Sequence, residues 1–280
     1  LQLNMSKTRL KTLFPKWFSC LCLFFFPCLC LSHPPTPLPT HLHIWTRNNE
    51  WESVTEMPTP KYLFGATAIG KKIYVCGGAN YNERLNLLEV YDSENNTWIE
   101  LAPMPNIRDR LGMATLNNHI YVAGGNDGSN KFSSVLKYSP ETNTWTEVKA
   151  MSEARCGHQL VTLHGVIYAI AGEGSKTVER YSPLNDKWIY ITPTNHNHSY
   201  FGATSHQNKI YVLSDQGFEV FHPESEIWEE LPSLEAGNGL QLVSINDKLL
   251  AIGVGLGSHK GRASKTVYEF DTVNNSWIHL

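Results

Sequence analysis

The sequence shows no excess of charge of either sign. Its 23 Lys and Arg residues against 26 Asp and Glu residues give a formal net charge of −3, and charged residues make up 18% of the chain. Proteins that hold nucleic acid through its phosphates carry clusters of basic residues, so the composition argues against a nucleic-acid partner. No run of like charges marks an interaction tail.

Cysteine is scarce over most of the chain. The long C-terminal part contains only Cys76 and Cys156, because the other cysteines all lie near the start, at Cys20, Cys22, Cys28 and Cys30. Two cysteines are too few for a disulfide framework, which favours a cytoplasmic protein. The early cysteines lie in an apolar run with no His among them, so we expect no metal site there.

There is one long hydrophobic run, over residues 17–31, and it is too short for a comfortable membrane span. Basic residues precede it and a proline-rich stretch follows at 34–39. This outline is typical of a signal peptide, in which case the protein is secreted. Two alternatives stay open: a segment not native to the protein, since the chain opens with Leu, and a membrane anchor. In each case we expect residues 1–41 to lie outside the folded domain at 42–280.

Recognisable catalytic motifs are also lacking. We find no Gly-x-Ser-x-Gly, no His-Glu-x-x-His and no carboxylate pair placed by a pattern. His196 and His198 are two potential metal ligands, but no Cys is near, so a solvated loop is the better interpretation. Asn95, Asn197 and Asn274 begin Asn-x-Ser/Thr acceptors that turn chemistry explains as well as secretion does. We predict no enzyme, no metal and no cofactor.

A repeat of 40–49 residues fills the rest of the chain. Counted from Trp51, the tryptophans are spaced by 47, 47, 43, 40 and 49 residues. Each is preceded seven residues earlier by an aromatic residue, in the pairs Tyr91–Trp98, Tyr138–Trp145, Tyr181–Trp188, Phe221–Trp228 and Phe270–Trp277. Self-similarity at such a period indicates a repeat architecture.

Each repeat is predicted to form four short strands. In the second full repeat we expect them at 111–116, 120–123, 135–138 and 144–148, with turn residues between them. A lone twisted four-stranded sheet cannot bury both faces, so the sheets are expected to stack radially around a channel. The paired glycines that follow the second strand suit a strand end with positive φ and a closely approaching backbone.

These features together resemble the kelch repeat. The structural positions are Gly77, Gly78, Trp98, Gly124, Gly125, Trp145, Gly172, Trp188, Trp228 and Trp277, with Met-Pro-like ends at Met104-Pro105, Met151-Ser152 and Leu231-Pro232. The sequence is most similar to the kelch half of BTB–kelch proteins, which are substrate adaptors of cullin-type ubiquitin ligases. Two repeats depart from the pattern, with Ser214-Asp215 and Gly253-Val254 in place of the glycine pair.

The resemblance implies an all-β kelch propeller of four-stranded blades. Residues 44–58 match only the third and fourth strands of a blade, so the chain holds five full repeats and an outer half-blade. Relatives of this type usually close with six blades, and we expect a six-blade ring in the intact protein. A five-blade ring is the alternative. Cys76 and Cys156 then fall in non-adjacent blades, too far apart for a disulfide.

The resemblance also implies a partner-binding face at the mouth of the channel. The expected residues enter innermost strands or follow second strands; they are Arg108, Arg110, Arg155 and Tyr200, and Asn80, Tyr81, Arg84 and Asn126, with Asp127, Glu173 and Ser175 nearby. Arg suits this role because its planar fork binds carboxylates through two hydrogen bonds. The alternative is that these arginines only tie down backbone carbonyls of a neighbouring blade.

The function implied is a protein–protein interaction module that delivers a substrate protein to a cullin ligase, which itself binds regions outside this sequence. An actin-binding scaffold and a secreted kelch enzyme acting on carbohydrate are the alternatives from other classes.

Overall fold

The computed structural model describes residues 43–45, 51–234, 240–253 and 266–280, and every regular element in these ranges is a β-strand. Within them, no helix is long and apolar enough to cross a membrane. The apolar run and the rest of the segment predicted to be separate, residues 1–41, lie outside the described residues.

The strands form five four-stranded antiparallel sheets, numbered here as blades 1 to 5. Blade 1 holds β3 (Gly65–Ile69), β4 (Lys72–Cys76), β5 (Leu88–Asp92) and β6 (Thr97–Leu101). Blade 2 holds β7 (Gly112–Leu116), β8 (His119–Ala123), β9 (Val135–Ser139) and β10 (Thr144–Val148). Blade 3 holds β11 (Gln159–Leu163), β12 (Val166–Ile170), β13 (Val178–Ser182) and β14 (Lys187–Ile191). Blade 4 holds β15 (Gly202–His206), β16 (Lys209–Ser214), β17 (Gly217–His222) and β18 (Ile227–Leu231). Blade 5 holds β19 (Leu240–Ile245), β20 (Lys248–Gly253), β21 (Thr266–Asp271) and β22 (Ser276–His279).

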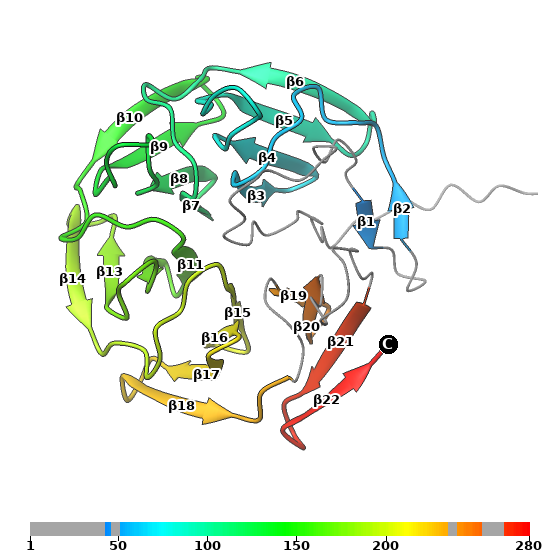
Figure 1. The fold of residues 1–280 in the computed structure, drawn as a ribbon, viewed down its shortest axis with the longest axis vertical. Helices are drawn as coiled ribbons and strands as arrows, with labels where there is room; N and C mark the ends of the chain where they lie inside the picture. The colour runs from blue at the N-terminus through cyan, green and yellow to red at the C-terminus, as the bar shows by residue number, and fades with distance from the viewer. Residues whose placement is uncertain (1–42, 46–50, 235–239, 254–265) are drawn as a thin grey trace, which may run out of the picture.

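The blades are arranged radially as a propeller, with the first strand of each blade nearest the axis and the fourth strand on the outside (Figure 1). The strands predicted for the second repeat agree with β7 to β10 within one residue at each end. A separate pair, β1 (His43–Trp45) and β2 (Trp51–Ser53), lies between blade 5 and blade 1 (Figure 1). This pair is a two-stranded sheet apart from the five blades.

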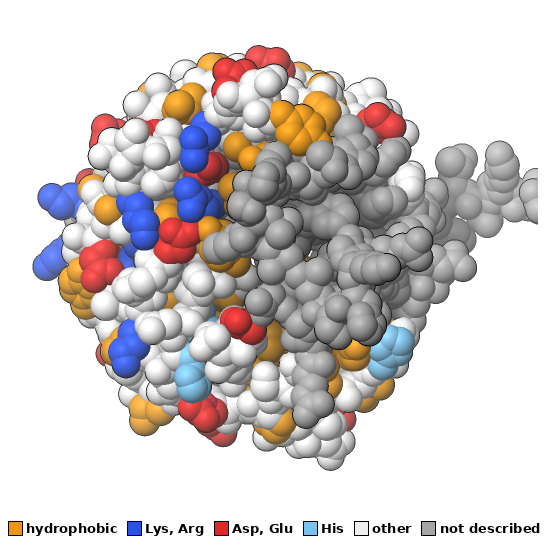
Figure 2. Space-filling view, in the orientation of Figure 1, with side chains coloured by type: hydrophobic (Ala, Val, Ile, Leu, Met, Phe, Trp, Pro, Cys, Tyr) orange, Lys and Arg blue, Asp and Glu red, His pale blue; other side chains and the backbone are white. Residues whose placement is uncertain are grey.

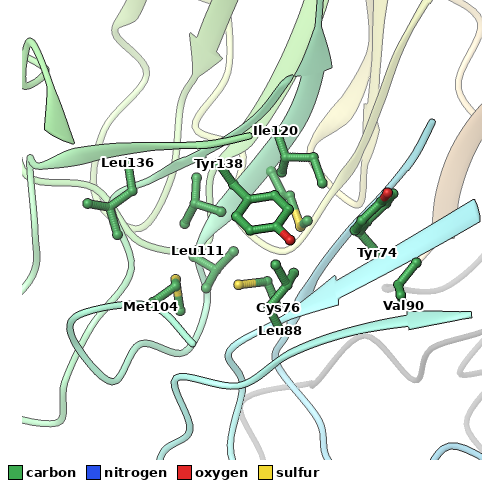
Figure 3. Packing of buried hydrophobic residues seen from close by; sticks show 11 residues of the cluster. Tyr74, Cys76, Leu88, Val90, Met104, Leu111, Ile120, Leu136 and Tyr138 are labelled. Atoms are coloured by element: carbon green, nitrogen blue, oxygen red, sulfur yellow. The ribbon is translucent and has the colours of Figure 1, made fainter. Parts of the chain in front are cut away.

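The hydrophobic core lies between blades, because each sheet is apolar on both faces. The second strands show this best: Ile73, Tyr74, Val75 and Cys76 of β4 are all buried. Figure 3 shows one such interface, where Tyr74, Cys76, Leu88 and Val90 of blade 1 face residues of blade 2; these are Met104, Leu111, Met113, Ile120, Val122, Leu136 and Tyr138. Equivalent clusters join blades 2 and 3, 3 and 4, and 4 and 5.

The recurring tryptophan connects each blade to the chain that enters it. Trp145 packs against Tyr138 at a ring separation of 5.0 Å, and its Nε1 donates to the carbonyl oxygen of Ala102 at 2.8 Å. The other four tryptophans make the same bond to Thr55, Lys149, Thr192 and Pro232. The tryptophan spacing seen in the sequence is therefore the spacing of these hydrogen bonds between each blade and the chain that enters it.

The glycine pairs lie where neighbouring blades approach most closely. Gly124 and Gly125 have φ of 61° and 93°, and the Gly125 amide donates to the carbonyl oxygen of Arg155 in the next blade at 2.7 Å. A Cβ on Gly124 would lie 2.4 Å from that oxygen. In blade 4 the pair is replaced by a two-residue turn, since Ser214 pairs directly with Gly217 across β16 and β17. That blade consequently has no long loop at this position.

Candidate partner-binding site at the channel mouth

The loops that follow the second strands and those that enter the first strands lie on one face of the ring. The innermost strands enclose a cavity of about 410 Å³ that runs along the axis. Its wall combines apolar residues such as Ala66 and Leu242 with polar ones such as Gln159 and Gln241. The charged side chain that lines this cavity is that of Arg110.

One repeat position lines the cavity in four consecutive blades. It lies twelve residues after the tryptophan and is occupied by Leu63, Arg110, Gly157 and Tyr200. Each has a left-handed backbone, with φ of 58°, 54°, 63° and 54°. Most other described non-glycine residues with positive φ lie in tight turns between strands, so the backbone alone does not mark this position as functional. What suits it to recognition is that its residue lines the cavity and differs from blade to blade.

Arg110 is the charged member of this set, and its side chain remains 21% exposed. Its Nε donates to Asp109 at 3.0 Å, and one terminal nitrogen donates to Glu173 at 2.9 Å and to the hydroxyl oxygen of Tyr200 at 3.3 Å. These hydrogen bonds and the charge of Asp109 outweigh the effect of burial and raise the pKa of Arg110 above its usual value. Arg110 is therefore a fixed cation at the mouth.

Glu173 accepts hydrogen bonds from several sides. The Cys156 Sγ donates to Oε2 at 2.9 Å, and the Tyr200 hydroxyl and Arg110 both donate to Oε1. Burial opposes ionisation of this carboxyl, but those hydrogen bonds and the Arg110 charge lower its pKa to about 2. Burial and the bond to Glu173 raise the pKa of Cys156 to about 12. At neutral pH the pair is a carboxylate and a thiol.

Two further cations complete the cluster. Arg84 pairs with Asp109 at 2.8 Å, and Lys131 lies 3.5 Å from the Glu173 carboxylate and donates to the Glu173 carbonyl oxygen at 3.0 Å. Together with Arg110 these cations face two carboxylates, so the cluster keeps one net positive charge. In Figure 2 basic and acidic side chains lie side by side on this face, over the inner part of blades 2 and 3.

Arg155 is placed differently from the expectation. Its side chain is buried, and the guanidinium donates to the carbonyl oxygens of Ala171 and Thr177, each at 2.9 Å. It also forms an ion pair with buried Glu179 at 3.0 Å. Arg155 therefore fastens the loop after the second strand of its own blade, and its guanidinium is not presented at the mouth.

Arg108 has the same buried placement, at 1% exposure. It donates to the carbonyl oxygens of Gly124 and Ser134 and stacks over the Phe132 ring at 4.5 Å. Both arginines therefore bind backbone carbonyl groups, as the alternative interpretation of the sequence expected. The carbonyl groups belong to a loop of the same blade and not to a neighbouring blade. This corrects the expectation that these guanidinium groups face a partner.

The remaining predicted residues lie on the loops of this face. Tyr81 is half exposed, while Asn80 accepts hydrogen bonds from the amides of Asn82 and Glu83 and so shapes its own loop. The Asn126 backbone pairs with that of Asp109, which joins two mouth loops. Asp127 likewise accepts amide hydrogen bonds within its own loop, and Ser175 bonds to Glu153 away from the cluster.

His196 and His198 do not form a metal site. His198 is fully buried and bonds to Ser214 and to Glu219, at 2.7 Å each, so the expectation of a solvated loop is wrong for this residue. His196 instead pairs with exposed Glu230 at 2.9 Å. Among the described residues, no group of three or more potential metal ligands comes together.

Sequence reasoning missed Asp109, Lys131 and Cys156 as members of the cluster. Asp109 directly precedes Arg110, and a carboxylate beside a predicted recognition arginine was a usable signal. Lys131 reaches Glu173 from a loop of blade 2, and Cys156 reaches it from the segment that enters blade 3, so no local pattern connects them.

Fold and site together define a β-propeller built from kelch-type repeats, with its variable side chains at one channel mouth. A family model described as the KLHDC2/KLHL20/DRC7 Kelch-repeats domain matches residues 38–217, and the chain belongs to this Kelch-repeat family. 

Two relatives illustrate the similarity. The chain is 27% identical over 102 residues to "Kelch repeat and BTB domain-containing protein 8" of Danio rerio, a match that covers 36% of this chain and 17% of that protein. The solved structure titled "Structure of YjhT" superposes with a TM-score of 0.74 at 15% identity, covering 86% of this chain and 91% of that one. The second likeness concerns the fold alone.

Proposed function

We propose that this propeller is a substrate-recognition module that binds a short acidic or phosphorylated segment of a partner protein at the channel mouth. The observation that carries the proposal is Arg110, a partly exposed cation on a left-handed backbone, in a cluster with one net positive charge. A planar guanidinium held in place recognises carboxylate and phosphate groups with both geometry and charge.

Membership of the Kelch-repeat family supports an interaction module over an enzyme. The similarity to a protein that carries kelch repeats and a BTB domain supports the further step, delivery of the bound partner to a cullin-type ubiquitin ligase. That step is made by regions outside this sequence. As part of the same proposal the protein acts in the cytoplasm, the ring has six blades, and β1 and β2 are the third and fourth strands of the sixth, within a domain at 42–280.

The test is quantitative capture of partners from cell lysate by the wild-type chain, Arg110→Ala and Lys71→Ala. Lys71 provides a matched control because its side chain is 38% exposed and it lies at the opposite ends of the inner strands. Breaking a hydrogen-bonded charge pair from one side costs about 2–5 kcal/mol of binding, so Arg110→Ala should lower capture at least about tenfold.

Folded concentrations are matched beforehand by circular dichroism. The proposal predicts that Lys71→Ala retains every partner and that Arg110→Ala loses them. If Arg110→Ala is folded and captures the same proteins in the same amounts, the mouth is not the recognition face.

A further inference from the structure

The donors at the mouth converge on a single carboxylate that belongs to the chain itself. Arg110, Cys156 and Tyr200 donate to the two oxygens of Glu173, and the Lys131 ammonium lies 3.5 Å from one of them. These groups come from blades 2, 3 and 4. Such a convergence of positive and hydrogen-donating groups from separate elements is the arrangement of an anion-binding site.

Glu173 differs from the carboxylates that hold the blades together. Glu89, Glu179 and Glu219 lie on third strands and are buried, with exposures of 2%, 0% and 0%. The Glu173 side chain is 25% exposed and lies in the loop between β12 and β13. A strand carboxylate cannot leave its position without opening a sheet, whereas a loop carboxylate can.

The residue after Glu173 favours such a movement of the side chain, while the amides of Gly172 and Glu173 stay bonded to the carbonyl oxygens of His198 and Cys156. Glu173 is flanked by Gly172 and Gly174, both with positive φ, of 117° and 81°. Glycine adopts alternative backbone conformations at little cost, and a Cβ built on Gly174 meets nothing within 4 Å. Arg110 keeps its position if Glu173 leaves, because Asp109 still holds its Nε at 3.0 Å.

We propose that the channel mouth contains an anion site which Glu173 fills in the free protein, and that an acidic or phosphorylated group of the partner binds by replacing it. This inference rests on the proposed function for the identity of the partner group. It adds how that group reaches the donors, namely by displacing the Glu173 carboxylate. Glu173 acts as an internal competitor, so the apparent affinity for a partner is the intrinsic affinity multiplied by the fraction of molecules in which the site is open.

A ligand must bind the donors more strongly than the Glu173 carboxylate does in order to displace it. A single carboxylate replaces Glu173 with a group of equal charge, whereas a phosphate brings up to about two charges and three acceptor oxygens. Phosphorylated segments are therefore expected to displace Glu173 more effectively than carboxylate-bearing ones, and the discrimination should weaken once Glu173 is neutral.

The first test is chemical rescue of Glu173→Ala, which removes the carboxylate and leaves the donors. Melting temperatures of wild type and variant are measured at pH 7 in sodium acetate and in sodium chloride of equal ionic strength. A ligand that binds only the folded state raises its stability with concentration. The expected result is a saturable acetate-specific rise for Glu173→Ala that is absent in the wild type and in Glu173→Ala/Arg110→Ala.

The second test uses Glu173→Gln, which keeps the shape of the side chain. It can therefore still decide the question if the alanine variant does not fold. Binding of inorganic phosphate by the full chain is measured by isothermal titration calorimetry. The variant should bind phosphate at least about tenfold more tightly than the wild type, because the competing carboxylate is gone.

The inference is overturned if acetate and chloride act alike on Glu173→Ala, or if Glu173→Gln and wild type bind phosphate equally. Either result leaves the proposed function standing when Arg110→Ala still abolishes partner capture. Conversely, rescue by acetate together with unchanged capture by Arg110→Ala would establish the anion site and refute the partner-binding role.

Discussion

Backbone conformation decides what an arginine does in this protein. Arg108 and Arg110 are two residues apart, yet the first is buried over Phe132 and the second faces the axis with φ of 54°. The buried position recurs ten residues after Trp51, Trp98, Trp145 and Trp188, as Lys61, Arg108, Arg155 and His198. In three blades it faces a glutamate of the third strand, at 2.5 to 3.0 Å. It is the structural basic residue of the repeat, and Arg155 is its cation in blade 3.

Replacing this cation should destabilise the fold strongly. Arg155→Met leaves Glu179, which is 0% exposed, without its guanidinium. Removing one partner of a buried ion pair costs about 3–5 kcal/mol, so we expect a loss of that size in the free energy of unfolding by urea. Arg110→Ala should cost clearly less, because its side chain is partly exposed.

A second variant separates charge burial from lost packing. Blade 2 has Leu136 where blade 3 has Glu179, so the repeat accepts leucine at this place, and Glu179→Leu added to Arg155→Met removes the buried carboxylate that Arg155→Met leaves unpaired. The double variant should regain part of the stability. Equal stabilities of the two single variants Arg155→Met and Arg110→Ala would contradict the assignment of Arg155 as structural.

The ionisation of Glu173 predicts a specific acid response. Its pKa is about 2 in the folded protein against an ordinary value of 4.5, so its contribution to stability is present above pH 4.5 and is lost as the pH falls toward 2. Glu173→Gln lacks this contribution. The difference in melting temperature between wild type and Glu173→Gln should therefore be larger at pH 7 than at pH 3. A difference that does not change with pH would mean that the carboxylate is not held in its charged form.

At the scale of the element, the turn before the fourth strand works together with the tryptophan. Asn143 has φ of 53°, and its Oδ1 accepts from the Ala102 amide at 2.9 Å and from the Tyr138 hydroxyl at 2.7 Å. Trp145 binds the Ala102 carbonyl oxygen. Ala102 is thus held on both sides of its backbone, and Asn96 and Asp186 repeat the Asn143 contacts in blades 1 and 3.

Asn143→Ala should lower stability by about 1–3 kcal/mol, because it removes the acceptor of two hydrogen bonds and the short polar side chain that makes a left-handed backbone tolerable for a non-glycine residue. Asn143→Gly removes the same acceptor without the backbone strain and should be the milder variant. Glu141→Ala, in the same exposed turn, is the control and should change little. The measurement is thermal unfolding, and a neutral Asn143→Ala would show that the turn does not tie the blades.

Element positions could be predicted from the sequence far better than side-chain roles. The aromatic–tryptophan spacing predicts the strands, because each pair occupies directly opposed places in neighbouring strands, such as Tyr138 and Trp145. The roles of Arg108 and Arg155 could not be predicted in this way, because a strand pattern does not show which side of an entering loop is buried. A basic residue at one fixed distance from the tryptophan and, in three blades, a glutamate at another were visible in the sequence, but only the structure shows that they touch.

At the scale of the whole molecule, stability comes from blade-to-blade packing without cross-links among the described residues. Cys76 and Cys156 lie in blades 1 and 3 as buried free thiols. Burial raises the pKa of Cys76 to about 12, and burial with the Glu173 contact does the same for Cys156. Because the thiolate is the reactive form, both groups should be inert in the folded protein.

The prediction is that iodoacetamide at pH 8 labels neither cysteine in the native protein and labels both after unfolding in urea. Mass spectrometry of the non-reduced protein should find both as thiols. A peptide linked through Cys76 and Cys156 would contradict the placement of these residues in separate blades.

Site-specific photo-crosslinking shows whether a partner protein binds at the channel mouth. A benzophenone amino acid replaces Tyr81, half exposed on a mouth loop, or Leu184, which is 93% exposed in the turn between β13 and β14 at the other face. Each protein is irradiated in lysate and the crosslinked products are identified by mass spectrometry. We expect partner crosslinks from position 81 that Arg110→Ala abolishes, and none to the same partners from position 184. Crosslinks to those partners from position 184, undiminished by Arg110→Ala, would contradict this expectation.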